Sequence, residues 1–357
     1  MNQLCQHYLE CGGCELQHLN AKQYLSYKNQ TLLNRLAEAK ITPKTTDPLF
    51  IVGTYKRRRC TIQVGYENGK ILLGFYKKKS HVVVDMHQCL VLTPNIFELL
   101  SLLRVCLAKL TQPKALKSVY ILDSHSGIDL VIHASYEPQL KCLEILVKFS
   151  TENNLARVGW QVNDKILPIC SIKPVTSCIN NLLVDLPPGT FLQATKECEE
   201  LIQKQIQNNV TADTRRVIDL YAGCGTFSLI FEQNIQVVSV EGDKNMANIL
   251  NQAIKRYKLK NVQAITQDLF RHPISTTELS KFDLAIIDPP RNGALPQIKE
   301  LAKSRIKAIM MISCNIDSFI RDAKLLIENG YKLHTLTPID QFYWTKHLEL
   351  SAFFLHK

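Results

Sequence analysis

The sequence predicts an α/β chain in two parts: a doubly wound parallel sheet over residues 189–357, preceded by an α+β region over residues 1–188. The later part alternates short apolar segments with helical ones, which is typical of parallel strands joined by helices on both faces of a sheet. The earlier part has strands separated by turn residues. The turn-rich stretch Leu186-Pro187-Pro188-Gly189 lies between the two, so we expect the boundary there.

Composition indicates an ordinary soluble protein with basic character. The 357 residues are 46% hydrophobic, which suits about two domains, and no window approaches the ~20 apolar residues of a membrane helix. The N-terminus lacks the features of a secretory signal, so we expect a cytoplasmic monomer without a membrane partner. Residues 1–190 carry 22 Lys and Arg against 14 Asp and Glu, and this excess favours RNA as a partner. Many basic soluble proteins nevertheless bind no nucleic acid.

The first part opens with closely spaced cysteines, followed by a helical stretch around residues 24–40. Alternating apolar runs on either side of Glu67-Asn68-Gly69 predict a hairpin, because Asn-Gly is a strong two-residue turn signal. Residues 95–185 mix one or two helices with further strands.

The second part predicts five strands, at residues 217–221, 237–242, 261–268, 282–290 and 306–314. Apolar residues at helical spacing predict helices over 246–253 and 316–327. In such a sheet ligands bind beyond the carboxyl ends of the strands, so the chemistry is expected there.

Four acidic residues end successive strands: Asp219, Glu241, Asp268 and Asp288. Gly223 and Gly225, which follow the first strand, let the backbone approach a ligand closely. An acid 22 residues after Asp219 suits hydrogen bonds to ribose hydroxyls, and the short glycine loop fits S-adenosylmethionine better than a dinucleotide. Each acid alone could instead be a helix N-cap.

Cys314 is the sharpest catalytic candidate, since it ends the fifth strand directly before a predicted helix. A thiolate there is stabilised by the helix dipole and free backbone N–H groups, so we expect a lowered pKa. A buried structural cysteine is the alternative. The C-terminal segment 347–357 alternates in period two, and its pattern by itself predicts that Glu349 is a solvated carboxylate at the rim of the sheet.

Several segments together resemble the RNA uracil-5-methyltransferases of the class I, Rossmann-like type. They are Cys5-x5-Cys11-Gly-Gly-Cys14, GFYKKKSHVVVD with Cys89, Phe191-Leu192-Gln193, DLYAGCGT, Glu241, DPPRNGA, ISCN and DQFYWTKHLE. The resemblance implies that Cys314 is the nucleophile and Glu349 the base. It also implies a set that holds S-adenosylmethionine: Gln193, Tyr221, Gly223, Glu241 and Asp288, with Asp268 near the adenine.

The chemistry of that reaction needs these groups. Uracil C5 is a poor nucleophile until a thiolate adds to C6, and a carboxylate must afterwards remove the C5 proton. The target base has to leave its helix or loop, and Phe342, Tyr343 and Trp344 are candidate stacking partners.

By the same resemblance, Cys5, Cys11, Cys14 and Cys89 match ligands of a 4Fe–4S cluster, although a structural zinc site can use four cysteines as well. The resemblance thus implies a first region that combines this cluster with RNA binding. The runs Lys56-Arg57-Arg58-Arg59 and Lys77-Lys78-Lys79 are candidate phosphate contacts, or else solvated strand edges.

The chain departs from the family pattern in three places. Many members begin with an additional small β-barrel RNA-binding domain, the TRAM domain, whereas this sequence starts at the cysteines. Thr195 stands where asparagine is usual, and Asp340-Gln341-Phe342-Tyr343 replaces the usual aspartate–methionine–phenylalanine–proline. We expect 23S ribosomal RNA as the substrate, with transfer RNA as the alternative. An amino-group methyltransferase and a non-catalytic RNA-binding iron–sulfur protein are the competing interpretations.

Overall fold

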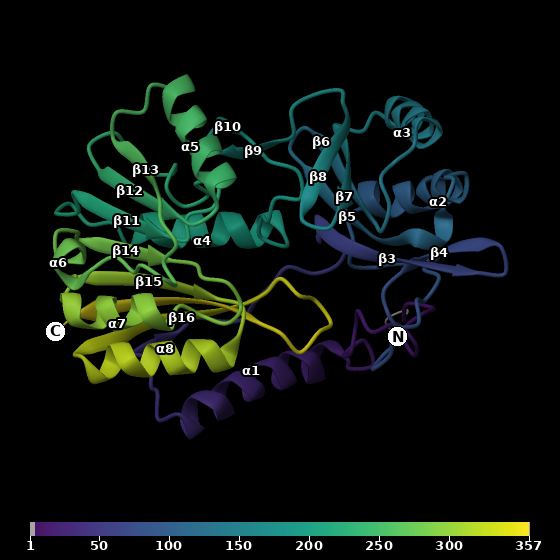
Figure 1. The fold of residues 1–357 in the computed structure, drawn as a ribbon. Coiled ribbons are helices and arrows are strands. Elements are labelled where there is room, and N and C mark those ends of the chain that lie inside the picture. Colours follow the sequence, from purple (N-terminus) through teal and green to yellow (C-terminus); the bar gives the residue numbers. More distant parts are fainter. Residues whose placement is uncertain (1–3, 357) are drawn as a thin grey trace.

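The computed structural model describes residues 4–356, which form two large sheets (Figure 1). The nine-stranded sheet has the order β1-β16-β17-β15-β14-β11-β12-β13, and β2 also pairs with β16. Its strands, in chain order, are β1 (Thr45–Thr46), β2 (Phe50–Ile51), β11 (Arg216–Leu220), β12 (Gln236–Glu241), β13 (Val262–Thr266), β14 (Leu284–Ile287), β15 (Ala308–Ser313), β16 (Tyr331–Asp340) and β17 (Glu349–His356). The five strands predicted from the sequence are therefore confirmed, with small shifts at their ends.

Parallel pairing runs from β13 to β15, as expected, but β17 is antiparallel to both β15 and β16. β17 enters the sheet between these two strands rather than at its edge. Both of its edges are consequently paired, and its side chains lie in the helix-covered cores on the two faces of the sheet.

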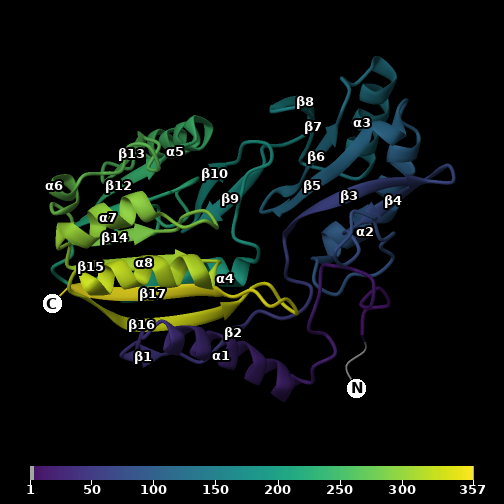
Figure 2. The same cartoon turned by 60° about the horizontal axis from the view of Figure 1, so that its bottom comes forward.

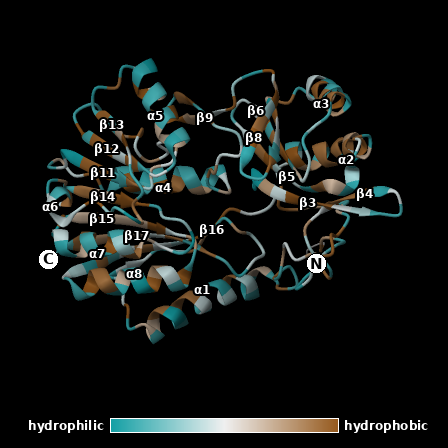
Figure 3. Ribbon diagram, viewed as in Figure 1, coloured by the Kyte–Doolittle hydropathy of each residue, from teal (hydrophilic) through white to brown (hydrophobic). Residues whose placement is uncertain are grey.

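Helices cover both faces of the large sheet. They are α1 (Ala21–Glu38), α4 (Lys196–Asn208), α5 (Lys244–Arg256), α6 (Thr276–Leu279), α7 (Leu295–Ser304) and α8 (Ile316–Glu328). Residues of α1, α7 and α8 pack on one face and residues of α4 and α5 on the other. Hydrophilic residues are frequent along the outer side of α5 (Figure 3).

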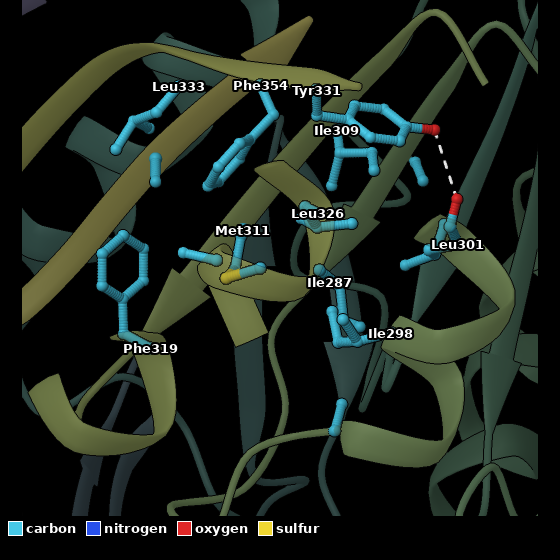
Figure 4. Packing of buried hydrophobic residues seen from close by; sticks show 14 of the residues in the cluster. Ile287, Ile298, Leu301, Ile309, Met311, Phe319, Leu326, Tyr331, Leu333 and Phe354 are labelled. Atoms are coloured by element: carbon cyan, nitrogen blue, oxygen red, sulfur yellow. Dashed lines mark hydrogen bonds between the residues drawn. The ribbon is translucent and has the colours of Figure 1, made fainter. Parts of the chain in front are cut away.

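Successive residues of each strand point to opposite faces, so each central strand contributes to two cores. Ile309 and Met311 of β15 join the core under α7 and α8, whereas Met310 and Ile312 join the core under α4. Figure 4 shows the first core, where the Tyr331 hydroxyl donates a hydrogen bond of 3.2 Å to the Leu301 carbonyl. Strands that are buried on both faces explain why the sequence shows continuous apolar runs here.

The second sheet has six strands in the order β4-β3-β5-β6-β7-β8 and is antiparallel except between β6 and β7. Its strands are β3 (Arg59–Glu67), β4 (Lys70–Gly74), β5 (Leu116–Ser124), β6 (Gly127–Ala134), β7 (Arg157–Val162) and β8 (Lys165–Ser171). The predicted hairpin turn falls between β3 and β4, where Asn68 and Gly69 both have positive φ. Helices α2 (Pro94–Ala108) and α3 (Leu140–Glu152) complete a separate apolar core, and the short helix η1 (Pro113–Ala115) precedes β5.

Between the two sheets the chain forms a small antiparallel pair, β9 (Thr176–Ile179) and β10 (Leu182–Asp185), and then enters α4. The division of the chain at residue 188 remains a prediction. Although they come from the first part of the chain, strands β1 and β2 belong to the large sheet and helix α1 packs against it (Figure 2). Within residues 4–356, no helix is both long and apolar enough to cross a membrane.

Candidate active site

A cavity of about 1040 Å³ opens beyond the carboxyl ends of β11, β12, β14 and β15. This is the edge at which ligands bind in doubly wound sheets. All eight candidate residues from the second part of the sequence line it: Gln193, Tyr221, Gly223, Glu241, Asp268, Asp288, Cys314 and Glu349. Residues of the second sheet, among them Arg57 and Arg59 beside β3, close the opposite wall.

Glu241 shapes the loop that follows β11. One carboxylate oxygen accepts the Gly223 N–H and the other accepts the Asp243 N–H, both at 2.8 Å. Tyr221, Gly223 and Gly225 all have positive φ, and a Cβ on Gly225 would come within 2.6 Å of the Leu250 side chain. The loop therefore needs glycine at position 225, and Glu241 holds its backbone in place at the cavity.

Asp268 and Tyr221 lie on the same side of the cavity. The Asp268 carboxylate accepts the Phe270 N–H at 2.9 Å, and the rings of Tyr221 and Phe270 lie 5.5 Å apart. The Tyr221 hydroxyl is buried without a hydrogen-bond partner among the described residues. An aromatic wall beside an acidic side chain suits a flat, polar ring such as a nucleobase.

Asp219 differs from the other three strand-end acids because it does not line the cavity. It is fully buried in β11, where it accepts a hydrogen bond of 2.5 Å from Ser228, and Ser239 in turn donates to Ser228. Burial raises the pKa of Asp219 to about 7. Its position is therefore that of a buried anchor beneath the glycine loop.

A chain of hydrogen bonds links the two carboxyl groups in the depth of the cavity. Gln193 donates through Nε2 to Asp288 Oδ2 at 2.8 Å. Gln341 donates through Nε2 both to Gln193 Oε1 at 3.0 Å and to Glu349 Oε2 at 2.6 Å. Asp288 and Glu349 are thus joined through two amide side chains, and all four groups lie within one polar network.

The prediction that Glu349 is a solvated rim carboxylate was wrong. The residue is 2% exposed, because β17 is inserted between β15 and β16 instead of forming the sheet edge. Burial and the nearby Asp288 raise the pKa of Glu349 well above its ordinary value, while Gln341 and Arg59 act in the opposite direction. Burial likewise raises the pKa of Asp288 to about 7. One of these two carboxyl groups can therefore carry a proton near neutral pH.

Cys314 lies where the sequence predicts it, between the end of β15 and the N-cap of α8, Asn315. The expected lowering of its pKa was wrong, however. Burial, followed by the charges of Glu349 and Asp288, raises the pKa of Cys314 to about 11, and Arg291 opposes them. The helix dipole acts on this thiol, but burial and the charges of the two nearby carboxyl groups outweigh it.

The basic run at residues 56–59 serves several roles. Arg58 forms a buried ion pair of 2.5 Å with Glu199 and donates to the Gln193 carbonyl at 3.0 Å, so it is no phosphate contact. Arg59 donates to the Leu192 carbonyl, and its guanidinium lies 3.9 Å from the ring centre of Phe191. In the second run, Lys78 donates to the Tyr8 carbonyl at 2.9 Å. The side chains that the sequence suggested for RNA thus partly hold the fold together.

The loop between β16 and β17 forms another wall of the cavity. Phe342 lines it, whereas Trp344 is only 7% exposed and packs with Leu16 and Tyr24. Trp344 is therefore a poor stacking partner for a flipped base. Figure 1 shows this loop, in yellow, reaching towards the N-terminal segment. There the Trp344 carbonyl accepts two backbone N–H groups, from Glu15 and Leu16.

The four candidate cluster ligands lie in one region but outside the cavity. Within residues 4–356, the structure does not arrange three or more His, Cys, Asp or Glu side chains as a group that could hold a metal ion. The thiols nevertheless lie within electrostatic reach of one another: Cys5, Cys11 and Cys89 all raise the pKa of Cys14, which burial brings to about 12. The Gly13 N–H donates to the Cys11 sulfur at 3.4 Å.

Sequence reasoning missed several residues of the cavity. Gln341 was singled out only as a departure from a family pattern, Arg57 and Arg59 only as candidate phosphate contacts, and Thr345 had no assigned role, yet all four line the cavity. His347 also lines the cavity, and burial together with Arg291 lowers its pKa. No local signal distinguishes these residues, because long-range packing brings them to the site.

The chain is similar in sequence to known RNA methyltransferases. A family model described as tRNA (Uracil-5-)-methyltransferase matches residues 182–357. An uncharacterized RNA methyltransferase of Zymomonas mobilis is 33% identical over 98% of this chain and 88% of its own length. The 23S rRNA (uracil(1939)-C(5))-methyltransferase of Shewanella woodyi is 31% identical over 98% of this chain and 81% of its own length.

The fold also resembles a solved structure. The tRNA (uracil-54, C5)-methyltransferase of Pyrococcus abyssi, in complex with S-adenosyl-L-homocysteine, superposes with a TM-score of 0.74 at 19% identity. The superposition covers 97% of this chain and 86% of that one. By its sequence similarity to curated relatives over nearly its whole length, the chain belongs to the family of S-adenosylmethionine-dependent RNA uracil-5-methyltransferases.

Proposed function

We propose that the chain transfers a methyl group to C5 of a uridine in RNA through a covalent bond between Cys314 and C6 of the uracil. The observation that carries this proposal is that Cys314 and Glu349 share a single cavity with the strand-end residues expected to hold S-adenosylmethionine. Addition requires a thiol within reach of C6, and proton removal requires a carboxylate within reach of C5, so a thiol and a buried carboxyl group in one cavity suit both steps.

Residues of this chain carry out the addition and the proton removal of the proposed reaction. Cys314 gives its proton to solvent and its thiolate adds to C6, and the electron pair of the C5–C6 double bond moves onto C5 and O4 as an enolate. Bound S-adenosylmethionine supplies the methyl group that C5 takes. The Glu349 carboxylate then removes the C5 proton, the electron pair forms the C5–C6 double bond, and the C6–S bond breaks. Cys314 returns as a thiolate. Arg291, which lowers the pKa of Cys314, supports both the first step and the last.

The residues present suit S-adenosylmethionine. Glu241 lies where ribose hydroxyls are bound in doubly wound folds, and Asp268 with Tyr221 and Phe270 suits an adenine. Asp288 and Gln193 would contact the amino-acid end of the molecule, since Asp288 acts electrostatically on Cys314 and Gln193 donates a hydrogen bond to Asp288.

We propose 23S ribosomal RNA as the substrate, because the Shewanella woodyi relative, which acts on that RNA, matches almost the whole chain. Transfer RNA is the second candidate, favoured by the Pyrococcus abyssi structure and by the description of the family model. The excess of basic side chains in residues 1–190 supports RNA binding on the side of the smaller sheet.

We further propose that Cys5, Cys11, Cys14 and Cys89 hold a 4Fe–4S cluster. The support is the donor set itself, four cysteines in mutual electrostatic reach, with the Gly13 N–H directed at the Cys11 sulfur. Because the reaction needs no electron transfer, the cluster would act as a structural clamp. Iron and sulfide analysis of anaerobically purified protein tests this, and a stoichiometric zinc content would contradict it.

The deciding experiment combines two measurements. Nucleoside mass spectrometry of separated ribosomal and transfer RNA, from cells with and without the gene, should show loss of 5-methyluridine in one fraction. Purified Glu349→Gln protein should form a complex with that RNA that survives denaturing electrophoresis, because Cys314 adds and cannot leave. Turnover retained by Cys314→Ala protein would contradict the mechanism.

A further inference from the structure

Gln341 holds a central position in the cavity. It follows Asp340, the last residue of β16, and in the β16–β17 pairing Ile339 lies opposite Glu349. Gln341 is two residues beyond Ile339, so its side chain points to the same face of the sheet as Glu349, one diagonal step away. A glutamine side chain spans that distance, and the resulting hydrogen bond measures 2.6 Å.

The orientation of the Gln341 amide is fixed by its two acceptors. Asp288 accepts from the Gln193 amide nitrogen, so the Gln193 oxygen has to face Gln341. Glu349 presents a carboxylate oxygen on the other side. Both N–H groups of Gln341 are thereby used, and its Oε1 has no partner among the described residues. With 3% exposure, the side chain has little room for another arrangement.

A buried ion pair at the preceding residue, Asp340, fixes the position of Gln341. The carboxylate of its neighbour Asp340 accepts hydrogen bonds from the Tyr24 hydroxyl, at 2.6 Å, and from Lys28 Nζ, at 3.0 Å. These contacts fix the backbone from which the Gln341 side chain reaches Glu349. The amide is therefore a preorganised donor.

Building on the proposed function, we propose that Gln341 is a positioning residue for the proton-removal step: its amide N–H orients the Glu349 carboxylate towards the C5 proton and favours its ionised form. A hydrogen bond from an N–H to a carboxylate favours the charged form. In this site that contribution opposes burial and the charge of Asp288, which both favour the protonated form. A protonated Glu349 cannot accept the C5 proton, so loss of the donor should slow the last step and leave the first one intact.

The test uses Gln341→Met, which keeps the length of the side chain and removes both N–H groups. A hydrogen bond to a charged group is worth about 10- to 150-fold in an equilibrium. At pH 7 we expect turnover to fall within that range, with S-adenosylmethionine affinity nearly unchanged by calorimetry. The covalent protein–RNA complex should accumulate during turnover, and the acid limb of the pH–rate profile should move up by about one to two units.

The pH dependence distinguishes positioning from a merely structural role. Raising the pH should restore ionised Glu349 and lower the trapped fraction in Gln341→Met, whereas the complex of Glu349→Gln should persist at every pH. Gln341→Leu, with a differently shaped end, should give the same pattern. Gln205→Leu is a matched control, because Gln205 also has a buried Oε1 without a partner among the described residues and donates to Thr337, outside the cavity.

Two outcomes would overturn the inference. A wild-type pH profile in Gln341→Met would show that the amide does not govern Glu349. A loss of turnover without any trapped complex, at unchanged cofactor affinity, would place Gln341 in an earlier step. If Glu349→Gln itself traps no RNA and the wild-type protein forms no 5-methyluridine, the proposed function fails instead, and the two failures are thus distinguishable.

Discussion

Lys28 and Asp340, which are 312 residues apart in the sequence, form a buried ion pair. The distance from Lys28 Nζ to Asp340 Oδ1 is 3.0 Å, and the two side chains are 1% and 0% exposed. Lys28 also donates to the His347 carbonyl at 2.6 Å, and the Tyr24 hydroxyl accepts the Trp344 N–H at 2.9 Å. Helix α1 therefore holds both ends of the loop that carries Gln341 and leads to Glu349.

Lys28→Met should destabilise the protein by about 3–5 kcal/mol, because it leaves the Asp340 carboxylate buried without a cation. Urea unfolding followed by circular dichroism measures this change. The double variant Lys28→Met/Asp340→Asn should recover part of the loss. Lys22→Met, at an exposed position of the same helix, should change the free energy of unfolding by no more than about 0.5 kcal/mol. A loss below about 1 kcal/mol for Lys28→Met would contradict the importance of the pair.

Alkylation of Cys314 should depend steeply on pH. Because its pKa is raised to about 11, the thiolate is a small fraction at pH 7 and rises about tenfold per pH unit through pH 9. Iodoacetamide labelling, read by peptide mass spectrometry, measures this in the free protein. Glu349→Gln removes one of the charges that raise the pKa, so its Cys314 should react faster at pH 8. A labelling rate that does not increase with pH above pH 7 would indicate a thiol of low pKa and contradict this assignment.

Asp219→Asn should change how stability depends on pH. In the folded protein the pKa of Asp219 is raised from 3.8 to about 7, so between these values the folded state binds more protons than the unfolded state. The wild-type protein therefore loses stability from this group as the pH rises from about 4 to about 7, by on the order of 4 kcal/mol at most. The asparagine of the variant does not titrate, so the difference in unfolding free energy should shift towards the variant over that range. Parallel pH curves for the two proteins would contradict the buried state of Asp219.

Glu241→Ala should weaken S-adenosylmethionine binding by at least about tenfold, since a hydrogen bond to a charged group is worth roughly that much. The loop at Gly223 loses its carboxylate acceptor, and so does the N–H of Asp243. Isothermal titration calorimetry gives the affinity. Glu232→Ala, a residue outside the cavity, serves as the control and should bind normally. Equal affinities in both variants would show that Glu241 does not organise the cofactor site.

Much of the site could be predicted from local sequence. Glu241, Asp268 and Asp288 end parallel strands, and the carboxyl ends of such strands meet at one edge whatever the details of packing. Cys314 was located by the same reasoning. Asp219 lies near the end of a strand as well, but its side chain is fully buried and does not line the cavity. The position of a residue at a strand end therefore predicts which part of the fold it occupies, but not whether its side chain is exposed.

The remaining features depend on contacts between distant segments. The alternation of apolar and polar residues over 347–357 predicts a strand but does not show which strands lie beside it. Glu349 is buried because β17 lies between β15 and β16. The pKa of Cys314 follows from the same event, since it brings a second carboxyl group to the thiol.

The sequence by itself thus determined the order of strands and helices, the edge at which the ligands bind and the residue types that gather there, because these follow from short-range periodicity and from the geometry of parallel strands. Only the tertiary structure decided that α1 and the first two strands join the large sheet, that Arg58 is buried against Glu199, and that Gln341 donates to Glu349. Burial and charge at a site are sums over neighbours from the whole chain, and no single segment contains them.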